Sequence, residues 1–196
     1  MKIGITGGIG SGKSQVSKLI ENSGYVVFNA DDIAKQIMID DESVRELIIL
    51  EFGENSYNNG ELNRSYLATK AFSSVENVAI LNAIVHPPMV EKINELMENE
   101  LKKSKIVFVE AALIYEAEVD SILDYVLLVT SDENSRIDRI KSRDGLSETE
   151  IRNRMKFQMP ESEKENLADF TIKNNSSLFE LEMKTKMFLS VFVAMS

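Results

Sequence analysis

The sequence predicts an α/β fold: a five-stranded parallel sheet flanked by helices. Two observations support it. Short apolar segments rich in β-branched residues recur along the chain, and segments with helical periodicity separate them. In addition, the first strand, helix and second strand fit within residues 2–28, which is typical of a βαβ unit with parallel strands.

The N-terminal elements follow each other closely. Residues 2–6 predict a buried strand that ends in a glycine-rich turn, and residues 13–23 predict a helix. Gly24 ends this helix, because a residue without a Cβ readily adopts the conformation that follows a helix. Residues 25–28 predict the second strand.

The segment 32–104 has helical periodicity and no convincing strand. Residues 58–60 (Asn-Asn-Gly) predict a turn, and residues 86–88 (His-Pro-Pro) predict a break in the helical pattern. The next strand starts only at residue 105, although a simple crossover needs about a dozen residues. We therefore expect a helical insertion that binds the acceptor of a reaction and carries substrate specificity.

The remaining elements complete the core. They are strands at 105–110, 124–129 and 168–172, and helices at 132–143, 147–158 and 177–193. Ser147 and Glu150 form a capping-box pattern at the start of one helix. We expect one domain, 1–196, with a core at 1–31 and 105–196 and a lid at about 132–160.

Composition excludes several kinds of protein. There is no cysteine and only one histidine, which excludes disulfides and disfavours a zinc site. The net charge of −10 disfavours nucleic acid as a partner. We find no secretory leader and no apolar run near the roughly 20 residues that span a bilayer, so we expect a cytoplasmic protein without a membrane partner. The oligomeric state is not predicted.

Residues 7–14 (Gly-Gly-Ile-Gly-Ser-Gly-Lys-Ser) match the P-loop pattern G-x-x-x-x-G-K-[ST] between a predicted strand and a predicted helix. Backbone N–H groups of such a loop, together with the helix N-terminus, bind phosphate. Lys13 is expected to reach the β- and γ-phosphates of ATP and Ser14 to bind Mg²⁺. The predicted ATP-binding residues of this region are Gly8, Ile9, Gly10, Ser11, Gly12, Lys13, Ser14 and Gln15.

Carboxylates follow two predicted strands at the same edge of the sheet. Glu110 could bind Mg²⁺ together with Ser14, or it could be an ordinary polar strand end. Asp31 or Asp32 could accept the proton of an acceptor hydroxyl, or both could be acids of the next helix's first turn.

Arg136, Arg139 and Arg143 lie on one face of a predicted helix. They could close over the transferring phosphoryl group as part of a lid. Alternatively, they form an exposed charged face paired with neighbouring aspartates. His86 could contact substrate or serve a structural role in a turn.

No N-K-x-D or D-x-x-G string occurs, which disfavours a switch GTPase and favours a small-molecule kinase. The chain resembles dephospho-coenzyme A kinases over nearly its whole length. The matching segments, in order, are residues 4–14, 30–34, 59–64, 86–87, 113–116, 139–144, 154–158 and 168–174.

The resemblance implies phosphorylation of the ribose 3′-hydroxyl of dephospho-CoA by ATP, with Mg²⁺. Asp31 would be the general base, and Lys13 and Arg139 would stabilise the transferring group. Further implied contacts are Arg143 and Asn174 to ATP, and Arg64, His86 and Leu113 to the acceptor. The chain departs from the family pattern at Gln15, Asn29, Glu110 and Ala112. Two alternatives remain open: a kinase for another small alcohol, and a non-catalytic ATP-binding regulator.

Overall fold

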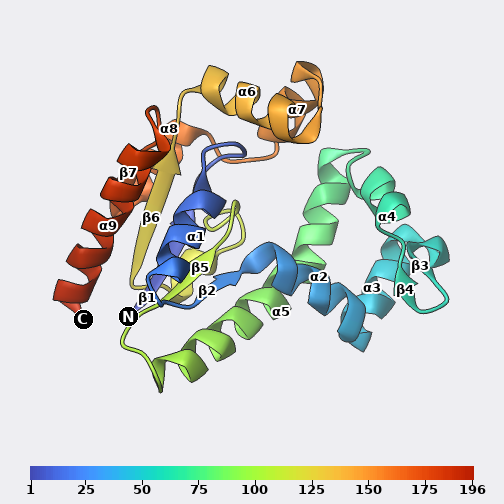
Figure 1. Cartoon of the computed structure of the whole chain (residues 1–196). Helices are drawn as coiled ribbons and strands as arrows, with labels where there is room; N and C mark the ends of the chain where they lie inside the picture. The colour runs from blue at the N-terminus through green and yellow to red at the C-terminus, as the bar shows by residue number, and fades with distance from the viewer. The chain divides into compact units, whose positions relative to one another are not determined.

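The computed structural model describes residues 1–196. The chain folds into two compact units. The first unit contains Met1–Asn29 and Glu95–Ser196 and holds the central sheet. The second unit, Ala30–Asn94, is mainly helical. Figure 1 shows the course of the chain through both.

The first unit is built on a five-stranded sheet whose strands all run parallel, in the order β2-β5-β1-β6-β7. This confirms the predicted sheet. The strands are β1 (Lys2–Thr6), β2 (Val27–Asn29), β5 (Val107–Glu110), β6 (Tyr125–Thr130) and β7 (Phe170–Lys173).

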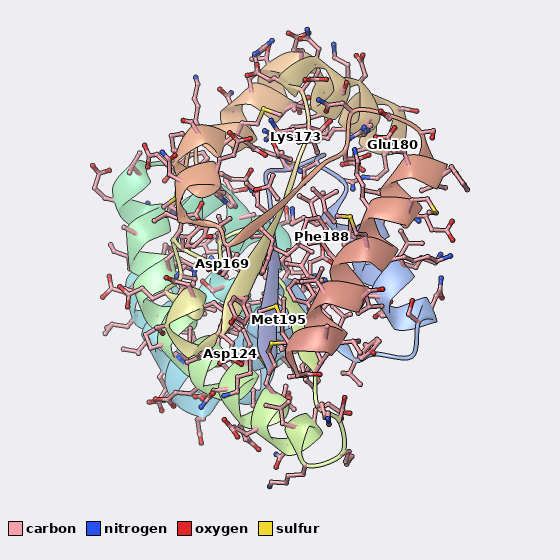
Figure 2. All side chains as sticks on the ribbon, turned by 90° about the vertical axis from the view of Figure 1, so that its left-hand side faces the viewer. Asp124, Asp169, Lys173, Glu180, Phe188 and Met195 are labelled. Atoms are coloured by element: carbon pink, nitrogen blue, oxygen red, sulfur yellow. The ribbon has the colours of Figure 1, made fainter.

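One face of the sheet is covered by α1 (Lys13–Asn22) and α9 (Leu178–Met195), which contact each other. Alternate residues of β1, Ile3 and Ile5, are buried in this layer because successive strand residues point to opposite faces. Phe170 of β7 packs against α9, which lies alongside the sheet in Figure 2. None of the helices is both long and apolar enough to cross a membrane.

Three helices follow β6: α6 (Glu133–Asp144), α7 (Glu148–Met155) and α8 (Glu161–Leu167). Ser147 and Glu150 form the predicted capping box at the start of α7. Helix α8 was not predicted from the sequence. Its residues favour helix but carry no apolar stripe, and Pro160, expected only to follow a helix end, is the N-cap of α8.

The second unit contains α2 (Ala30–Asp40), α3 (Glu42–Phe52), the 3₁₀ turn η1 (Glu54–Ser56), α4 (Arg64–Ala71) and most of α5 (Val75–Leu101). Asn59 and Gly60, with φ of 51° and 86°, form the predicted turn. That turn joins a short hairpin of β3 (Tyr57–Asn58) and β4 (Glu61–Leu62), so the prediction of no strand in this segment is wrong.

The predicted break at residues 86–88 is also wrong, because α5 continues through Pro87 and Pro88. Proline removes the hydrogen bond to the carbonyl four residues earlier, here those of Ala83 and Ile84. Both residues line an open groove of about 680 Å³ within this unit. A buried stripe of Val85, Met89 and Ile93 spans the prolines and stabilises the helix.

Candidate nucleotide-binding site

The P-loop at residues 7–14 connects β1 to α1, as predicted. Gly12 is the N-cap of α1 and has a φ of 106°, a conformation that side chains disfavour. A Cβ atom at this position would also lie 2.3 Å from Nδ2 of Asn174. Glycine is therefore required at residue 12 both by the backbone and by the space around it.

Lys13 lies in the first turn of α1, and its ammonium group folds back over the loop. Nζ donates hydrogen bonds to the carbonyls of Gly7, at 2.7 Å, and Gly8, at 3.3 Å. The positive charge is thus held beside the loop that is expected to bind phosphate.

Ser14 and Glu110 are brought together by the sheet. Glu110 ends β5 and is in register with Ile5 of β1 and Asn29 of β2. The Ser14 hydroxyl donates a hydrogen bond to the Glu110 carboxylate at 2.8 Å, and Glu110 is only 8% exposed. One hydroxyl and one carboxylate suit Mg²⁺, which keeps several waters and takes the rest of its ligands from phosphate.

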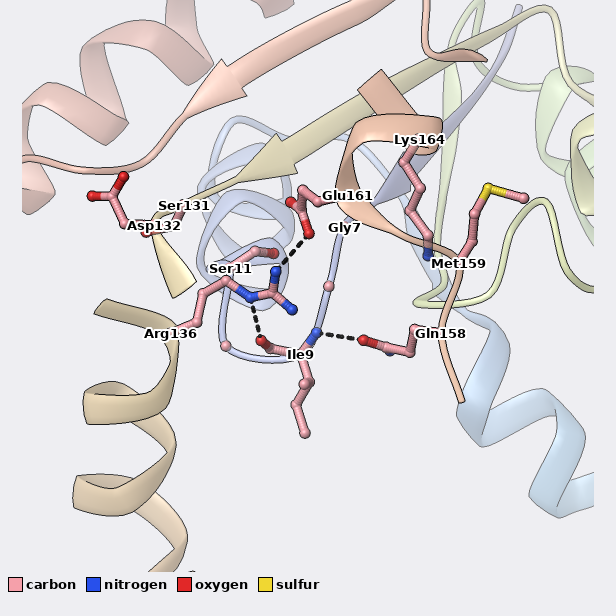
Figure 3. A network of polar contacts seen from close by, with 12 residues as sticks. Gly7, Ile9, Ser11, Ser131, Asp132, Arg136, Gln158, Met159, Glu161 and Lys164 are labelled. Atoms are coloured by element: carbon pink, nitrogen blue, oxygen red, sulfur yellow. Dashed lines mark hydrogen bonds and ion pairs between the residues drawn. The ribbon is translucent and has the colours of Figure 1, made fainter. Parts of the chain in front are cut away.

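Ile9, at the apex of the loop, is held through both of its backbone polar groups (Figure 3). Arg136 of α6 donates from Nε to the Ile9 carbonyl at 2.9 Å, and the Ile9 N–H donates to the side-chain oxygen of Gln158 at 2.9 Å. Arg136 also forms an ion pair with Glu161 of α8, with 2.6 Å between Nη1 and Oε2. The helices after β6 therefore contact the P-loop directly.

Arg139 and Asn174 contact the next part of the loop. Asn174 Nδ2 donates to the Ser11 carbonyl at 2.8 Å, and Arg139 Nη2 donates to the Asn174 carbonyl at 2.8 Å. Nη1 of Arg139 lies 3.3 Å from the Gly10 carbonyl and 3.1 Å from the Ser131 hydroxyl. The structure thus brings both predicted residues to the P-loop.

The arginines further along these helices lie elsewhere. The side chain of Arg143 is 66% exposed and pairs with Asp144 at 2.7 Å, and this hydrogen bond lowers the pKa of Asp144. Arg152 pairs with Glu133 and Glu148. Their positions match the alternative of an exposed, paired face more closely than a role at the P-loop.

The predicted acceptor residues fall mostly in the second unit. Asp31 lies in the first turn of α2, Arg64 is the first residue of α4, and His86 lies within α5. Leu113 follows β5 in the first unit. Their roles stay predictions.

Lys164 of α8 was missed by the sequence analysis. It is completely buried, donates to the Ala112 carbonyl at 2.7 Å and pairs with Glu116 at 3.1 Å. Glu116 also accepts from the backbone N–H of Met159 at 2.7 Å. Lys164 stands among glutamates in the sequence, which indicates an exposed helix, so no local signal marks it as buried.

The neighbouring Tyr115 has a buried hydroxyl without a hydrogen-bond partner. Burial, followed by the charges of Asp169, Asp120 and Glu116, raises the pKa of Tyr115 to about 12. The segment after β5 therefore carries a buried phenol at Tyr115 and, at Glu116, the partner of the buried Lys164 of α8.

A family model described as dephospho-CoA kinase matches residues 1–180. The chain belongs to this family. A dephospho-CoA kinase of Corynebacterium glutamicum is 35% identical over 95% of this chain and 96% of the relative. One of Fusobacterium nucleatum is 37% identical over 96% of both.

Solved structures agree. A dephospho-CoA kinase from Campylobacter jejuni superposes with a TM-score of 0.74 at 28% identity, covering 97% of this chain and 96% of the other. A shikimate kinase from Acinetobacter baumannii gives a TM-score of 0.57 at 13% identity over 98% of this chain and 93% of the other, a likeness of fold alone. The P-loop kinase fold is thus confirmed.

Proposed function

We propose that this protein transfers the γ-phosphoryl group of ATP to the ribose 3′-hydroxyl of dephospho-CoA, giving CoA and ADP in the last step of CoA biosynthesis. The observation that carries the proposal is the P-loop with Lys13 folded over it and Ser14 bonded to Glu110, in a chain that belongs to this family. The substrates would meet in the cytoplasm.

The P-loop would bind the phosphates of ATP. The N–H groups of Gly8, Gly10 and Gly12 would serve as donors, whereas those of Ile9 and Ser11 are bonded to Gln158 and to the Gly8 carbonyl. The N-terminus of α1 adds about half a positive charge. Lys13, whose Nζ lies 2.7 Å from the Gly7 carbonyl of the loop, would move from the loop carbonyls to the β- and γ-phosphates. This would neutralise charge where it develops in the transition state.

Ser14 and Glu110 would hold Mg²⁺, which supplies electrostatic stabilisation of the phosphate oxygens when bound. Because the carboxylate accepts from the serine hydroxyl, it fixes the rotamer of Ser14 before any ligand arrives. Glutamate stands here where the family pattern has aspartate, and its reach to Ser14 supports the same function.

Asp31 would accept the proton of the 3′-hydroxyl while the oxygen attacks the γ-phosphorus. The new bond joins that oxygen to phosphorus, the bond from the γ-phosphorus to the β–γ bridging oxygen breaks, and ADP leaves. Its place in the first turn of α2, two residues beyond the end of β2, supports this role. Arg64, His86 and Leu113 would contact the acceptor.

Arg139 would stabilise the transferring group from the lid side. Its guanidinium already reaches the Gly10 carbonyl of the loop at 3.3 Å, which supports this assignment. Asn174 would lie near ATP through its hydrogen bond to Ser11. For Arg143, exposure and the pair with Asp144 give no comparable support.

The test is a panel of acceptors with the purified protein and MgATP. ADP release is followed with dephospho-CoA, adenosine, shikimate and gluconate, and the position of the new phosphate is read by ³¹P and ¹H NMR. We expect turnover with dephospho-CoA alone, yielding a 3′-phosphate. Faster turnover of another alcohol would support a different small-molecule kinase, and MgATP binding without any transfer would support a regulator.

A further inference from the structure

The apex of the P-loop is held by hydrogen bonds and packing contacts from residues that follow β6. The carbonyl of Ile9 accepts from Arg136, its N–H donates to Gln158, and its side chain packs against a buried cluster of Ile137, Ile140 and Ile151. The carbonyl, the N–H and the side chain of Ile9 are therefore all held by residues outside the P-loop. The sequence motif gives no reason for this, because the pattern leaves this position unspecified.

The burial of Arg136 carries an energetic cost. Its side chain is 9% exposed, and that of its partner Glu161 is 23% exposed. A buried ion pair loses the hydration of both charges and is often no more stabilising than apolar residues of the same volume. Stability alone therefore does not explain why a guanidinium lies here.

The hydrogen bond to Ile9 offers an explanation. The peptide between Ile9 and Gly10 is planar, so its C=O and N–H point in opposite directions. With the carbonyl held by Arg136, the Gly10 N–H is directed away from the guanidinium. Gly10 has a φ of 80°, which glycine adopts readily, so the backbone itself does not fix this peptide and the hydrogen bond from Arg136 holds its carbonyl directly.

The guanidinium also covers Gly8. A Cβ atom at residue 8 would lie 2.2 Å from Nη2 of Arg136 and 2.8 Å from Oε2 of Glu161. The ion pair thus packs directly against the loop. Arg136 holds the carbonyl of the Ile9–Gly10 peptide, and Gln158 holds the N–H of the Gly8–Ile9 peptide.

We propose that Arg136 is a positioning residue of the nucleotide site: paired with Glu161, it fixes the Ile9–Gly10 peptide so that the loop amides are oriented for phosphate before ATP binds. It acts through the loop backbone and does not touch substrate. The inference rests on the proposed use of ATP and extends it to a residue of the lid. Removing the anchor should weaken ATP binding without changing the acceptor's KM.

Three variants test this. Arg136→Met removes the anchor but leaves Glu161 without its cation, which destabilises the fold. Arg136→Met combined with Glu161→Gln removes the anchor and the unpaired charge together. Arg152→Met is the matched control, because Arg152 pairs with Glu133 and Glu148 on the same helices and has no bond to the P-loop.

Calorimetric titration with MgATP in the absence of acceptor measures affinity, thermal melting measures stability, and initial rates give KM for ATP and dephospho-CoA separately. We expect about a tenfold loss of MgATP affinity in Arg136→Met, as for a lost hydrogen bond to a charged group. In the double variant the melting temperature should recover while the affinity loss persists. Arg152→Met should bind MgATP like the wild type.

Recovery of affinity together with melting temperature in the double variant would overturn the proposal, since Arg136 would then be purely structural. Wild-type affinity in Arg136→Met would overturn it as well. If Arg136→Met does not stay folded, the double variant decides. MgATP binding is measured without acceptor. If dephospho-CoA proved not to be a substrate, that would therefore contradict the proposed reaction but not the role of Arg136 in MgATP binding.

Discussion

The hydroxyl of Ser14 lies 2.8 Å from the carboxylate of Glu110 and donates a hydrogen bond to it. Ser14 belongs to the first turn of α1, and Glu110 is the last residue of β5. The P-loop helix is thus tied, through one side-chain contact, to the strand beside β1. These two oxygens are the site proposed for Mg²⁺.

Replacing Glu110 by Gln should raise the Mg²⁺ concentration needed for half-maximal activity several-fold. The amide oxygen can still accept from Ser14, so the local fold is kept while the negative charge that attracts the cation is lost. Activity is measured against Mg²⁺ at fixed total ATP. Glu163→Gln, an exposed change on α8, is the control. An unchanged Mg²⁺ dependence would remove Glu110 from the site.

Replacing Asp31 by Asn should retain MgATP binding and lower kcat by about 10²-fold or more, because the amide cannot accept the acceptor's proton. Single-turnover rates and MgATP titration measure the two effects. Asp32→Asn is the matched control: Asp32 is the next residue along α2, is 71% exposed and pairs with Lys35. A variant at 31 with nearly wild-type kcat would show that another group is the base.

Replacing Arg139 by Ala should lower kcat more than it weakens MgATP binding, because a cation that acts on developing charge contributes mainly in the transition state. The measurement is kcat together with the dissociation constant of MgATP, with Arg152→Ala as control. The opposite pattern, weak binding with normal kcat, would assign Arg139 to holding Gly10 and Asn174 in the ground state.

Replacing Lys164 by Met should lower the free energy of unfolding by about 3 kcal/mol, because the Glu116 carboxylate loses its ammonium partner in a largely buried setting. Urea denaturation measures the loss. Adding Glu116→Gln should restore part of it by removing the unpaired charge. An equal loss of unfolding free energy in the single and double variants would mean that Lys164 stabilises the fold through packing and not through its charge.

Replacing Tyr115 by Phe should change stability little near pH 7, because the buried hydroxyl has no hydrogen-bond partner to lose. The wild type should lose stability as pH rises from about 10 to about 12, since the unfolded phenol ionises at its usual pKa while the folded one stays neutral. The variant should lack this contribution. Parallel pH curves of unfolding free energy for the two proteins would show that the pKa of Tyr115 is not raised.

Patterned features of the fold could be predicted from sequence. The glycines and lysine of residues 7–14 sit between a strand and a helix as expected, and Ser147 with Glu150 form their capping box. Each depends on a few adjacent residues whose local preferences agree with the global fold. The buried strand predicted at residues 2–6 is confirmed as β1, and its Ile3 and Ile5 lie in the core.

Features decided by distant partners could not be predicted. Pro87 and Pro88 break helices by local rules, but α5 continues because its buried stripe outweighs two missing hydrogen bonds. Lys164 is buried because Glu116 and the Ala112 carbonyl, both far away in sequence, face it. Arg136 was expected among solvated or phosphate-facing arginines, and no local pattern reveals that its partner is the backbone of Ile9.

The closeness of Gly8 to the Arg136 guanidinium has a consequence for reading related sequences. Gly8 has no unusual φ, so the backbone alone would admit alanine there. A methyl group there would instead displace the Arg136 guanidinium and the Glu161 carboxylate from their present positions. The two positions should therefore co-vary, and a relative that carries a methyl group at the equivalent of residue 8 should have a shorter side chain at the equivalent of residue 136.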